Sequence, residues 1–509
     1  MTVVMISGYE GLRVFYGDLH SHCDVGYGQG TVEEAYANAR LQLDFASVTA
    51  HAAWPDMPEA TGPLAPTIEY HRRGFEAAAK GWPHLLQVTR EVTEEGRFVA
   101  FPSFEWHSLR YGDHNVYYRD ADGEIVRGPT LKALREALRE IASRGTLCYL
   151  IPHHIGYPRG YRGLDWSHFT GEFSPVVEIF SLHGAAEDDD APYPYLHTMG
   201  PRESRSTMRW GLTQGYVFGV IGSTDHHAAH PGSYGHGRAA VWARSLTRAD
   251  IWEAIGARRT CALTGDRIAV ALAVNGRPMG AILPWSRDRQ IDVAVVGGAP
   301  LDMVEVVHNG RPLHRWSPAG STGAAIGPHK VTLEVGWGDR AEIVDWQVEL
   351  AVEGGRFLSV EPRVRGPETV SPIPMRSTSG VTATCTQPEA GRVLFSARTC
   401  GNPTLTTTAT QGLCLEIDGT PAARLVGRIN GRPVDVTLAE LREGSRVGYL
   451  EGFRSAAYRF SRAAAYAEYS GTFSIRHRGV PGRRDWYYVR VRQVNDQWAW
   501  TSPIWVAGG

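Results

Sequence analysis

The sequence lacks any long apolar run. No stretch of 18 apolar residues occurs in the chain, and its opening segment lacks the basic start and apolar run of a secretion signal. We therefore expect a cytoplasmic protein with no membrane partner. The net charge of −2 provides no general attraction to nucleic acid, so no nucleic-acid partner is expected either.

Cysteine is also scarce. The six cysteines form no closely spaced pair and no Cys-x-x-Cys motif, which argues against a disulfide framework and against a cysteine-based zinc site. Histidine, in contrast, is concentrated in one half of the chain, because sixteen of the twenty histidines precede residue 240. The chemistry of the protein is therefore expected in this first half.

The segment RVFYGDLHSHCD, residues 13–24, combines a strand pattern with the spacing of metal ligands. Its apolar, aromatic run is followed by His20 and His22. Residues i and i+2 of an extended chain point the same way, so the two imidazoles can converge at the carboxyl end of a strand. Imidazole binds zinc, iron or manganese, and Asp18 and Asp24 offer carboxylate oxygens beside it.

Further predicted strands end on the same kinds of side chain. Thr31 and Glu34 form a capping box for a helix over 31–43, which leads into a strand over 44–49, so the first two strands should be parallel. Six or seven strands that each deliver His, Asp or Glu near one end are typical of a (β/α) barrel with its site on the carboxyl face. The side chains at or near these strand ends are His51, Glu105, His114, His153, His154, Glu178, His183, Asp225, His226 and His227.

The composition of the chain changes near residue 265. We predict an α/β metal-binding barrel over 1–265, with an insertion at about 52–97. From about residue 266, β-branched segments separated by Asn-Gly and Gly-Gly turns predict an all-β, sandwich-like region that extends to residue 509. A stretch rich in Pro, Ser and Thr at about 362–385 is expected to be a loop or linker, and the segment WYYVRVRQVNDQWAWTSPIWV is expected to form a hairpin that turns at Asn-Asp.

The ordered set GDLHSH, VTAH, FEW, GDHNV, PHH and GSTDHH resembles the polymerase and histidinol phosphatase (PHP) superfamily of metal-dependent phosphoesterases. The segments TGDR-x(7)-NG-x-x-MG and YYVRV…AWTSPIWV are similar to a large bacterial branch that carries a domain of unknown function. The first resemblance covers residues 13 to about 265, and the second covers the tail. The resemblance to the PHP superfamily implies a distorted (β/α)7 PHP-type barrel that holds two or three divalent metal ions.

The resemblance also implies which residues hold these ions. Glu105 would bridge a first and a second ion. The superfamily usually has Asp directly before the second-strand histidine, where this chain has Ala50, so the surroundings of a third ion should differ. Carried over position by position, the first ion would be bound by His20, His22 and Asp225, the second by His114 and one of His153 or His154, and the third by His51 and His227, with Asp24 as a further candidate.

These residue types suit hydrolysis of a small phosphate ester by an activated water. Two divalent ions stabilise the attacking and leaving oxygens of an in-line displacement and ionise water near pH 7, so no serine or cysteine nucleophile is required. The candidate catalytic residues are Glu105, as the bridging carboxylate, and His183 and His226, as proton donors to the leaving oxygen. The arginines that follow ligand-bearing strands and could grip an anionic substrate are Arg159, Arg162, Arg202, Arg205 and Arg209.

Other functions remain open from the sequence. The same ions could hold a sulfate or phosphonate ester, and two-metal barrels also hydrolyse C–N and C–O acyl bonds, for which pocket walls poor in arginine would be expected. A non-catalytic metal-binding module is a further alternative, in which Ala50 would mark the loss of activity. The sequence does not decide between zinc, manganese and iron, and it leaves open whether the chain forms a homo-oligomer.

Overall fold

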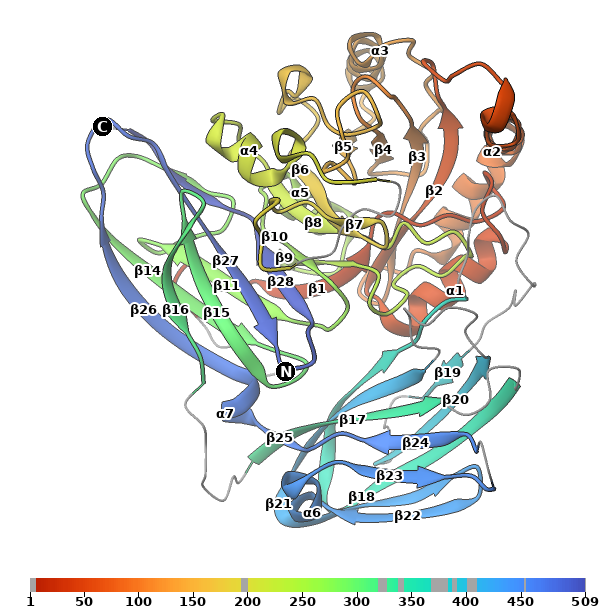
Figure 1. Cartoon of the computed structure of the whole chain (residues 1–509), viewed down its shortest axis with the longest axis vertical. Helices are drawn as coiled ribbons and strands as arrows, with labels where there is room; N and C mark the ends of the chain where they lie inside the picture. The colour runs from red at the N-terminus through yellow and green to blue at the C-terminus, as the bar shows by residue number, and fades with distance from the viewer. Residues whose placement is uncertain are drawn as a thin grey trace.

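The computed structural model describes residues 6–193, 200–318, 327–336, 343–367, 383–386, 391–400, 410–452 and 455–508. Figure 1 shows three bodies: an α/β unit that carries the long helices, a β-sandwich at its side, and a further β-unit below both. Strands dominate the fold. No helix in the described part of the chain is both long enough and apolar enough to span a bilayer.

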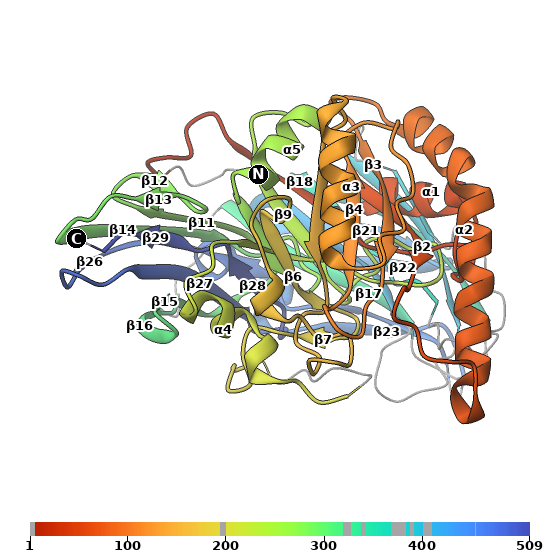
Figure 2. The same cartoon turned by 90° about the horizontal axis from the view of Figure 1, so that it is seen from above.

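The α/β unit begins with two consecutive β-α-β crossovers. β1 (Arg13–Asp18), β2 (Phe45–Ala53) and β3 (Val99–Trp106) are parallel neighbours, joined by α1 (Val32–Gln42) and α2 (Ala65–Val92). Both hydrogen bonds of the predicted capping box are present at the start of α1. The segment predicted to be an insertion contains α2, a helix of 28 residues that makes the crossover from β2 to β3. Figure 2 shows α2 along the outer edge of the unit.

The next strands depart from the regular alternation of a (β/α)7 barrel. β4 (His114–Tyr118) is antiparallel to both β3 and β5 (Cys148–Pro152), although α3 (Leu131–Ser143) lies between β4 and β5 in sequence. On the other side of the sheet, β9 (Arg238–Ala243) is antiparallel to β1 and to β10 (Thr260–Leu263). The parallel direction is therefore confirmed for β1 to β3, whereas β4 and β9 run against it; β5 and β10 each pair antiparallel with one of these two strands and so share the direction of β1 to β3.

A separate small sheet faces the open side of this unit. Its strands β6 (Val176–Ser181) and β8 (Gly219–Gly222) are parallel, and β7 (Gly184–Ala185) pairs with β6. Among the described strands, no backbone ladder pairs β5 with β6 or β8 with β10, although the Thr260 hydroxyl donates to the Val220 carbonyl at 2.8 Å. The structure therefore shows an α/β unit rather than a closed, regular barrel. The short helices of the unit are α4 (Met208–Thr213) and α5 (Arg248–Gly256).

The inner faces of these strands carry an apolar layer and a polar layer. Phe45, Phe101 and Ile151 belong to one buried apolar cluster. Side chains alternate along a strand, so residues an even number of positions farther along share the face of these apolar residues. This periodicity brings a set of metal-ligand side chains together above the apolar cluster. The set consists of His51, Glu105, Asp113, His153 and Asp225.

The C-terminal hairpin joins the sheet of the α/β unit. β27 (Asp485–Gln493) and β28 (Trp498–Thr501) turn at Asn495 and Asp496, as the sequence predicts, and β28 pairs with β10. This extension and a second sheet share one buried core, so a sandwich lies beside the α/β unit. The other strands of the sandwich are β11 (Ala269–Val274), β12 (Arg277–Pro278), β13 (Ile282–Leu283), β14 (Asp288–Val296), β15 (Leu301–His308), β16 (Arg311–Trp316), β26 (Ser470–Arg478) and β29 (Ile504–Val506).

A third body lies between β16 and β26 in the chain (lower part of Figure 1). Its nine-stranded sheet is built around β18 (Ile343–Arg363) and β21 (Gln411–Ile429), with 21 and 19 residues. The stretch predicted as a linker starts at the end of β18, and its residues 368–382 lie outside the described residues. The other elements are β17 (Gly327–Gly336), β19 (Ala383–Cys385), β20 (Arg392–Cys400), β22 (Arg432–Thr437), α6 (Leu438–Glu443), β23 (Arg446–Tyr449), β24 (Ala457–Phe460), β25 (Ala464–Ala465) and α7 (Tyr466–Tyr469).

Candidate metal centre

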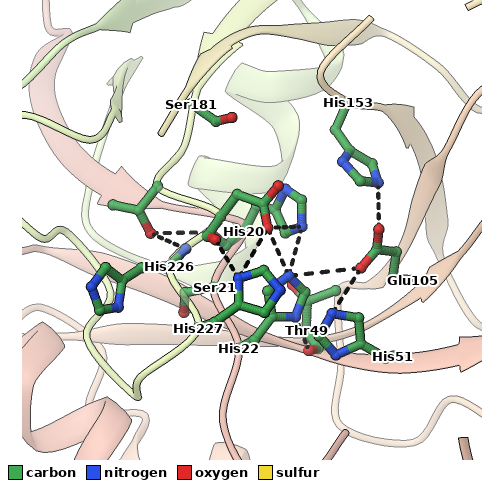
Figure 3. A network of polar contacts seen from close by, with 12 residues as sticks. His20, Ser21, His22, Thr49, His51, Glu105, His153, Ser181, His226 and His227 are labelled. Carbon is green, nitrogen blue, oxygen red and sulfur yellow. Dashed lines mark hydrogen bonds and ion pairs between the residues drawn. The ribbon is translucent and has the colours of Figure 1, made fainter. Parts of the chain in front are cut away.

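Buried histidines and carboxylates converge where the strands of the α/β unit end (Figure 3). In the described part of the chain, five groups of three or four possible ligand atoms each lie within 4.8 Å of one another. The groups share members, so they form one continuous cluster, which we call the donor cluster. It consists of His20, His22, His51, Glu105, His107, Asp113, His153, His154, Glu178, Asp225 and His227.

The first group contains His20, His22 and Asp225, as the sequence predicts. Oδ1 of Asp225 lies 2.9 Å from Nε2 of His22 and 3.4 Å from Nε2 of His20. The Nδ1 atoms of both rings point outward: that of His20 donates to Glu178 at 3.0 Å, and that of His22 to the Thr49 carbonyl at 2.9 Å. These outer partners fix the rings so that both Nε2 atoms face Asp225, the arrangement that metal-binding histidines use.

Asp18 supports this group from behind. Its carboxylate accepts hydrogen bonds from the backbone N–H groups of His20 at 3.0 Å, Thr224 at 3.0 Å and Gly232 at 2.8 Å. These bonds tie the end of β1 to the loop that carries Asp225, whose φ of +54° lies in the left-handed region. Asp18 is therefore an organising residue, and it belongs to none of the groups of possible ligands.

Glu105 lies at the middle of the donor cluster. Its Oε1 is 3.1 Å from Nε2 of His153, and its Oε2 is 3.4 Å from Nε2 of His51. Oε2 also lies 3.7 Å from Nε2 of His22. One carboxylate thus faces histidines from three different strand ends, which is the position expected of a bridging ligand.

The group predicted to hold a third ion contains His51 and His227 beside His22. The His51 and His22 rings are stacked with centroids 3.8 Å apart, and the His227 ring lies 4.4 Å from that of His22. Nδ1 of His227 donates to the Asp225 carbonyl at 2.8 Å, which orients its ring. These three imidazoles are therefore arranged as a possible ligand set.

The protonation of the cluster is set by burial and by its carboxylates. Burial lowers the pKa of His51, and the neighbouring His22 lowers it further, so its imidazole stays neutral and able to bind a metal. Burial likewise lowers the pKa of His153 well below its usual range. His20 behaves differently: burial lowers its pKa, but Asp225 and Glu178 raise it more, to about 10. A metal bound at His20 would therefore have to displace a proton.

On the other side of Glu105, the group contains Asp113, His153 and His154. Oδ2 of Asp113 lies 3.5 Å from Nε2 of His154 and 3.3 Å from Nδ1 of His107. Arg162 reaches into this group and donates its Nε–H to Asp113 at 2.5 Å. Burial raises the pKa of Asp113, but the positive charge of Arg162 lowers it more. The pKa of this carboxyl therefore lies well below its usual range, and the carboxyl is ionised.

Three of the predicted ligands and proton donors have side chains that lie away from the donor cluster. His114 is on β4, where side chains alternate, so Asp113 points inward and His114 outward; its Nδ1 donates to the Gly112 carbonyl at 2.9 Å. Asp24 is exposed beside the first helix. His226 follows Asp225 but turns away, stacking on His236 with centroids 5.6 Å apart. The sequence-based roles of these three side chains do not match their positions.

Of the predicted substrate-binding arginines, Arg162 alone contacts the donor cluster in the described part of the chain. Arg202 donates to the Ala185 carbonyl at 3.1 Å. His183 is brought to the site, with its Nε2 3.2 Å from Oδ2 of Asp225 and 16% of its side chain exposed. The other arginines are held elsewhere: Arg159 pairs with Glu203, Arg205 lies over the Trp210 ring, and Arg209 pairs with Asp188.

Three members of the donor cluster were not predicted as ligands from the sequence. His107 lies two residues after Glu105, the same spacing as His20 and His22, so a shared face was predictable there. Glu178 was placed on a strand but given no role. Asp113 directly precedes His114, and the sequence does not reveal which face of β4, and therefore which of the two side chains, points inward.

Comparisons with known proteins give limited further information. No family model matches the chain. Three Chlamydia proteins described as uncharacterized match parts of it: one of C. pneumoniae, 26% identical over 273 residues (47% of this chain, 41% of that protein), one of C. muridarum, 30% over 176 residues (31% and 28%), and one of C. trachomatis serovar D, 28% over 343 residues (57% and 52%). The matched segment thus spans from about a quarter to about half of each relative's length.

One solved structure is also similar. It is the crystal structure of a two-domain protein from Bacteroides vulgatus "containing predicted PHP-like metal-dependent phosphoesterase". It aligns with a TM-score of 0.35 and 14% sequence identity, over 64% of this chain and 93% of that one.

Proposed function

We propose that the protein is a metal-dependent hydrolase of small phosphate esters, with two or three divalent ions in the donor cluster. The observation that carries the proposal is a set of buried ligand atoms without hydrogen bonds. Both ring nitrogens of His51 and of His153, and Oε2 of Glu105, are buried and have no hydrogen-bond partner among the described residues. Such atoms destabilise a fold when nothing satisfies them. Zinc, manganese or iron would suit these imidazole and carboxylate donors.

Two adjacent groups of ligands offer places for two ions. His20, His22 and Asp225 would hold one, and His51 and His227, beside His22, would hold the other. Glu105 faces both groups, since its Oε2 lies within 3.7 Å of His22 and within 3.4 Å of His51. Glu178 and the Thr49 carbonyl would keep the first-group imidazoles oriented.

The chain's own residues would bind the ester and move one proton. When bound, the ions supply positive charge that stabilises the substrate's oxyanion and lets water ionise near pH 7. Arg162 adds a fixed positive charge beside the ligands, which favours an anionic substrate. His183 is partly exposed, and its Nε2 faces Asp225, so its other ring nitrogen, Nδ1, would hold the proton that the leaving oxygen receives.

The position of Arg162 helps to choose among the alternative substrates. A buried arginine within the ligand set is the opposite of the arginine-poor wall expected for an acyl hydrolase. Sulfate and phosphonate esters carry similar tetrahedral oxyanions, so they remain the alternative substrates. A metal-binding module without activity would show the same ligands and no turnover.

Metal content and turnover together test the proposal. The purified chain would be loaded with Mn, Zn or Fe, analysed by mass spectrometry for metal, and assayed with phosphomonoester, diester, triester and sulfate model substrates. We expect at least two ions per chain and a phosphate-ester activity that chelation removes and metal restores. Fewer than two ions per chain under replete conditions would contradict the multinuclear site, and full metal content without turnover would identify a binding module.

A further inference from the structure

Arg162 reaches into the donor cluster on the Asp113 side of Glu105. Its Nη2 lies 2.8 Å from Nδ1 of His107 and 3.8 Å from Oε1 of Glu105, and it pairs with Asp113 through both Nε and Nη2. Only 16% of the side chain is exposed. The guanidinium therefore stands among atoms that could otherwise bind a cation.

The backbone places this side chain in one conformation. Arg162 has a φ of +74°, which is unusual for a residue with a side chain, and its N–H donates to the Leu109 carbonyl at 3.3 Å. The next residue must be glycine, because a Cβ at Gly163 would lie 1.6 Å from the Tyr157 carbonyl oxygen. The guanidinium also rests 5.5 Å above the Trp54 ring. The turn, the ring and the carboxylate together hold the charge at this spot.

The charges on the two sides of Glu105 are balanced differently. On the Asp113 side, a permanently charged guanidinium already faces the carboxylates of Asp113 and Glu105. On the opposite side, Asp225 faces the imidazoles of His20, His22 and His183, and no arginine of the described residues pairs with it. A divalent ion beside Arg162 would meet a like charge in a buried setting, where repulsion is strong.

We propose that Arg162 is a built-in cation that takes the place of a metal ion on the Asp113 side of Glu105. Metal ions then bind only in the group of His20, His22 and Asp225 and in the group of His51 and His227. The inference rests on the proposed metal-dependent function. It changes the ligand set implied by the sequence resemblance, in which Glu105, His114 and one of His153 or His154 would hold an ion.

Metal stoichiometry tests this directly. The full chain, its Arg162→Gln variant and its Arg162→Lys variant would be saturated with Zn or Mn, freed of excess metal and analysed by mass spectrometry. We expect two ions per chain in the wild type and in Arg162→Lys, which keeps one positive charge. Arg162→Gln should gain about one further ion, because the carboxylates lose their cation. Arg159→Gln, a variant of a nearby arginine that pairs with Glu203 outside the cluster, is the matched control and should stay at two.

Several outcomes separate this inference from the proposed function. Two ions in both the wild type and a folded Arg162→Gln variant, or three in the wild type, would overturn the role of Arg162 while leaving a metal centre in place. A wild type without bound metal would remove the proposed function as well. If Arg162→Gln does not fold, anomalous diffraction from zinc-loaded wild-type crystals decides: a zinc peak between Asp113 and His154 overturns the inference, and peaks confined to the other two groups support it.

Discussion

Two clusters of histidine and charged side chains in the described part of the chain differ in how their polar atoms are satisfied. In the sandwich, Asp485 accepts hydrogen bonds from Arg289 at 2.6 Å, Asn309 at 2.6 Å and His308 at 3.0 Å. His477 shares a hydrogen bond of 2.8 Å with the Tyr487 hydroxyl. We call these residues the Asp485 cluster. Within the described residues, Nη2 of Arg289 is the one buried side-chain nitrogen or oxygen of this cluster without a hydrogen-bond partner, and it is a donor rather than a possible metal ligand.

The donor cluster uses the same residue types with the opposite result. Buried nitrogens of His51 and His153 and an oxygen of Glu105 have no hydrogen bond, although they face one another across short distances. Buried, neutral imidazoles can satisfy the hydrogen-bonding capacity of a carboxylate only in part. A bound cation, in contrast, interacts with both the ring nitrogens and the carboxylate oxygens. Residue composition alone thus does not separate a structural cluster from a metal site, whereas unsatisfied imidazole nitrogens and carboxylate oxygens do.

Removing a first-group ligand should have the largest effect. We expect His20→Ala to lose an ion from each chain and to reduce kcat/KM by more than the ~10- to 100-fold typical of an outer partner. The physical reason is that Nε2 of His20, which lies 3.4 Å from Oδ1 of Asp225, is a possible ligand atom, and the methyl group of alanine supplies none. Metal analysis and steady-state kinetics with the best phosphate ester measure both changes. Unchanged metal content with unchanged activity would remove the distinction between the two clusters.

Breaking the Asp485 cluster should act on stability instead. Asp485→Asn leaves the buried Arg289 without its carboxylate, which costs about 3–5 kcal/mol for a buried pair. Burial raises the pKa of Asp485, but hydrogen bonds from Arg289 and Asn309 lower it more, so the folded pKa lies below the ordinary value. The stabilisation is thus complete above about pH 4 and is lost as the pH falls through the folded pKa.

The difference in unfolding free energy between wild type and Asp485→Asn should therefore be largest near neutral pH and shrink below about pH 4. Urea unfolding at a series of pH values measures it. Metal content should stay at the wild-type level throughout. A loss of metal in this variant, or a difference that grows in acid, would show that the two clusters are not independent.

A smaller effect is expected from the outer partner of His20. Glu178→Gln keeps an acceptor for Nδ1 of His20 but removes its charge, so metal affinity should fall by about 10- to 100-fold. Because Asp225 and Glu178 raise the pKa of His20 to about 10, metal binding releases its proton, and wild-type affinity should rise with pH. The rise should be shallower in the variant. Competition with a chromophoric chelator at several pH values measures both; equal affinity and equal slopes would assign Glu178 no role.

Much of the donor cluster could be predicted because strand ends are visible in the sequence. His20, His51 and Asp225 each follow an apolar run, so parallel strands suffice to bring them together. The choice among arginines could not be predicted, since it depends on which loop folds back over the site. Arg162 is positioned by a tight turn, whereas Arg209 is paired with Asp188 on a different loop.

The limits of the fold prediction have similar causes. Alternating β-branched segments identify strands but not the sheet to which each belongs, so the sandwich and the third body looked like one region. The order of strands and helices favoured a parallel barrel, yet β4 pairs antiparallel with both neighbours. All five residues of β4 are buried, so no alternation of polar and apolar residues shows which face points inward.

The smallest effect is expected from a substitution on β4, the strand whose inward face the sequence does not reveal. His114 is the predicted ligand that points away from the donor cluster, so His114→Gln should leave metal stoichiometry and kcat/KM unchanged. It removes a buried hydrogen bond to the Gly112 carbonyl, which costs about 1 kcal/mol of stability. His51→Gln is the matched comparison, because His51 is equally buried but its Nε2 lies 3.4 Å from Oε2 of Glu105, and this variant should lower metal affinity. Metal titration and thermal unfolding of both variants test the pair. Wild-type affinity in His51→Gln would remove His51 as a ligand, and loss of metal in His114→Gln would reverse the inward face of β4 and with it the place of Asp113 beside Glu105.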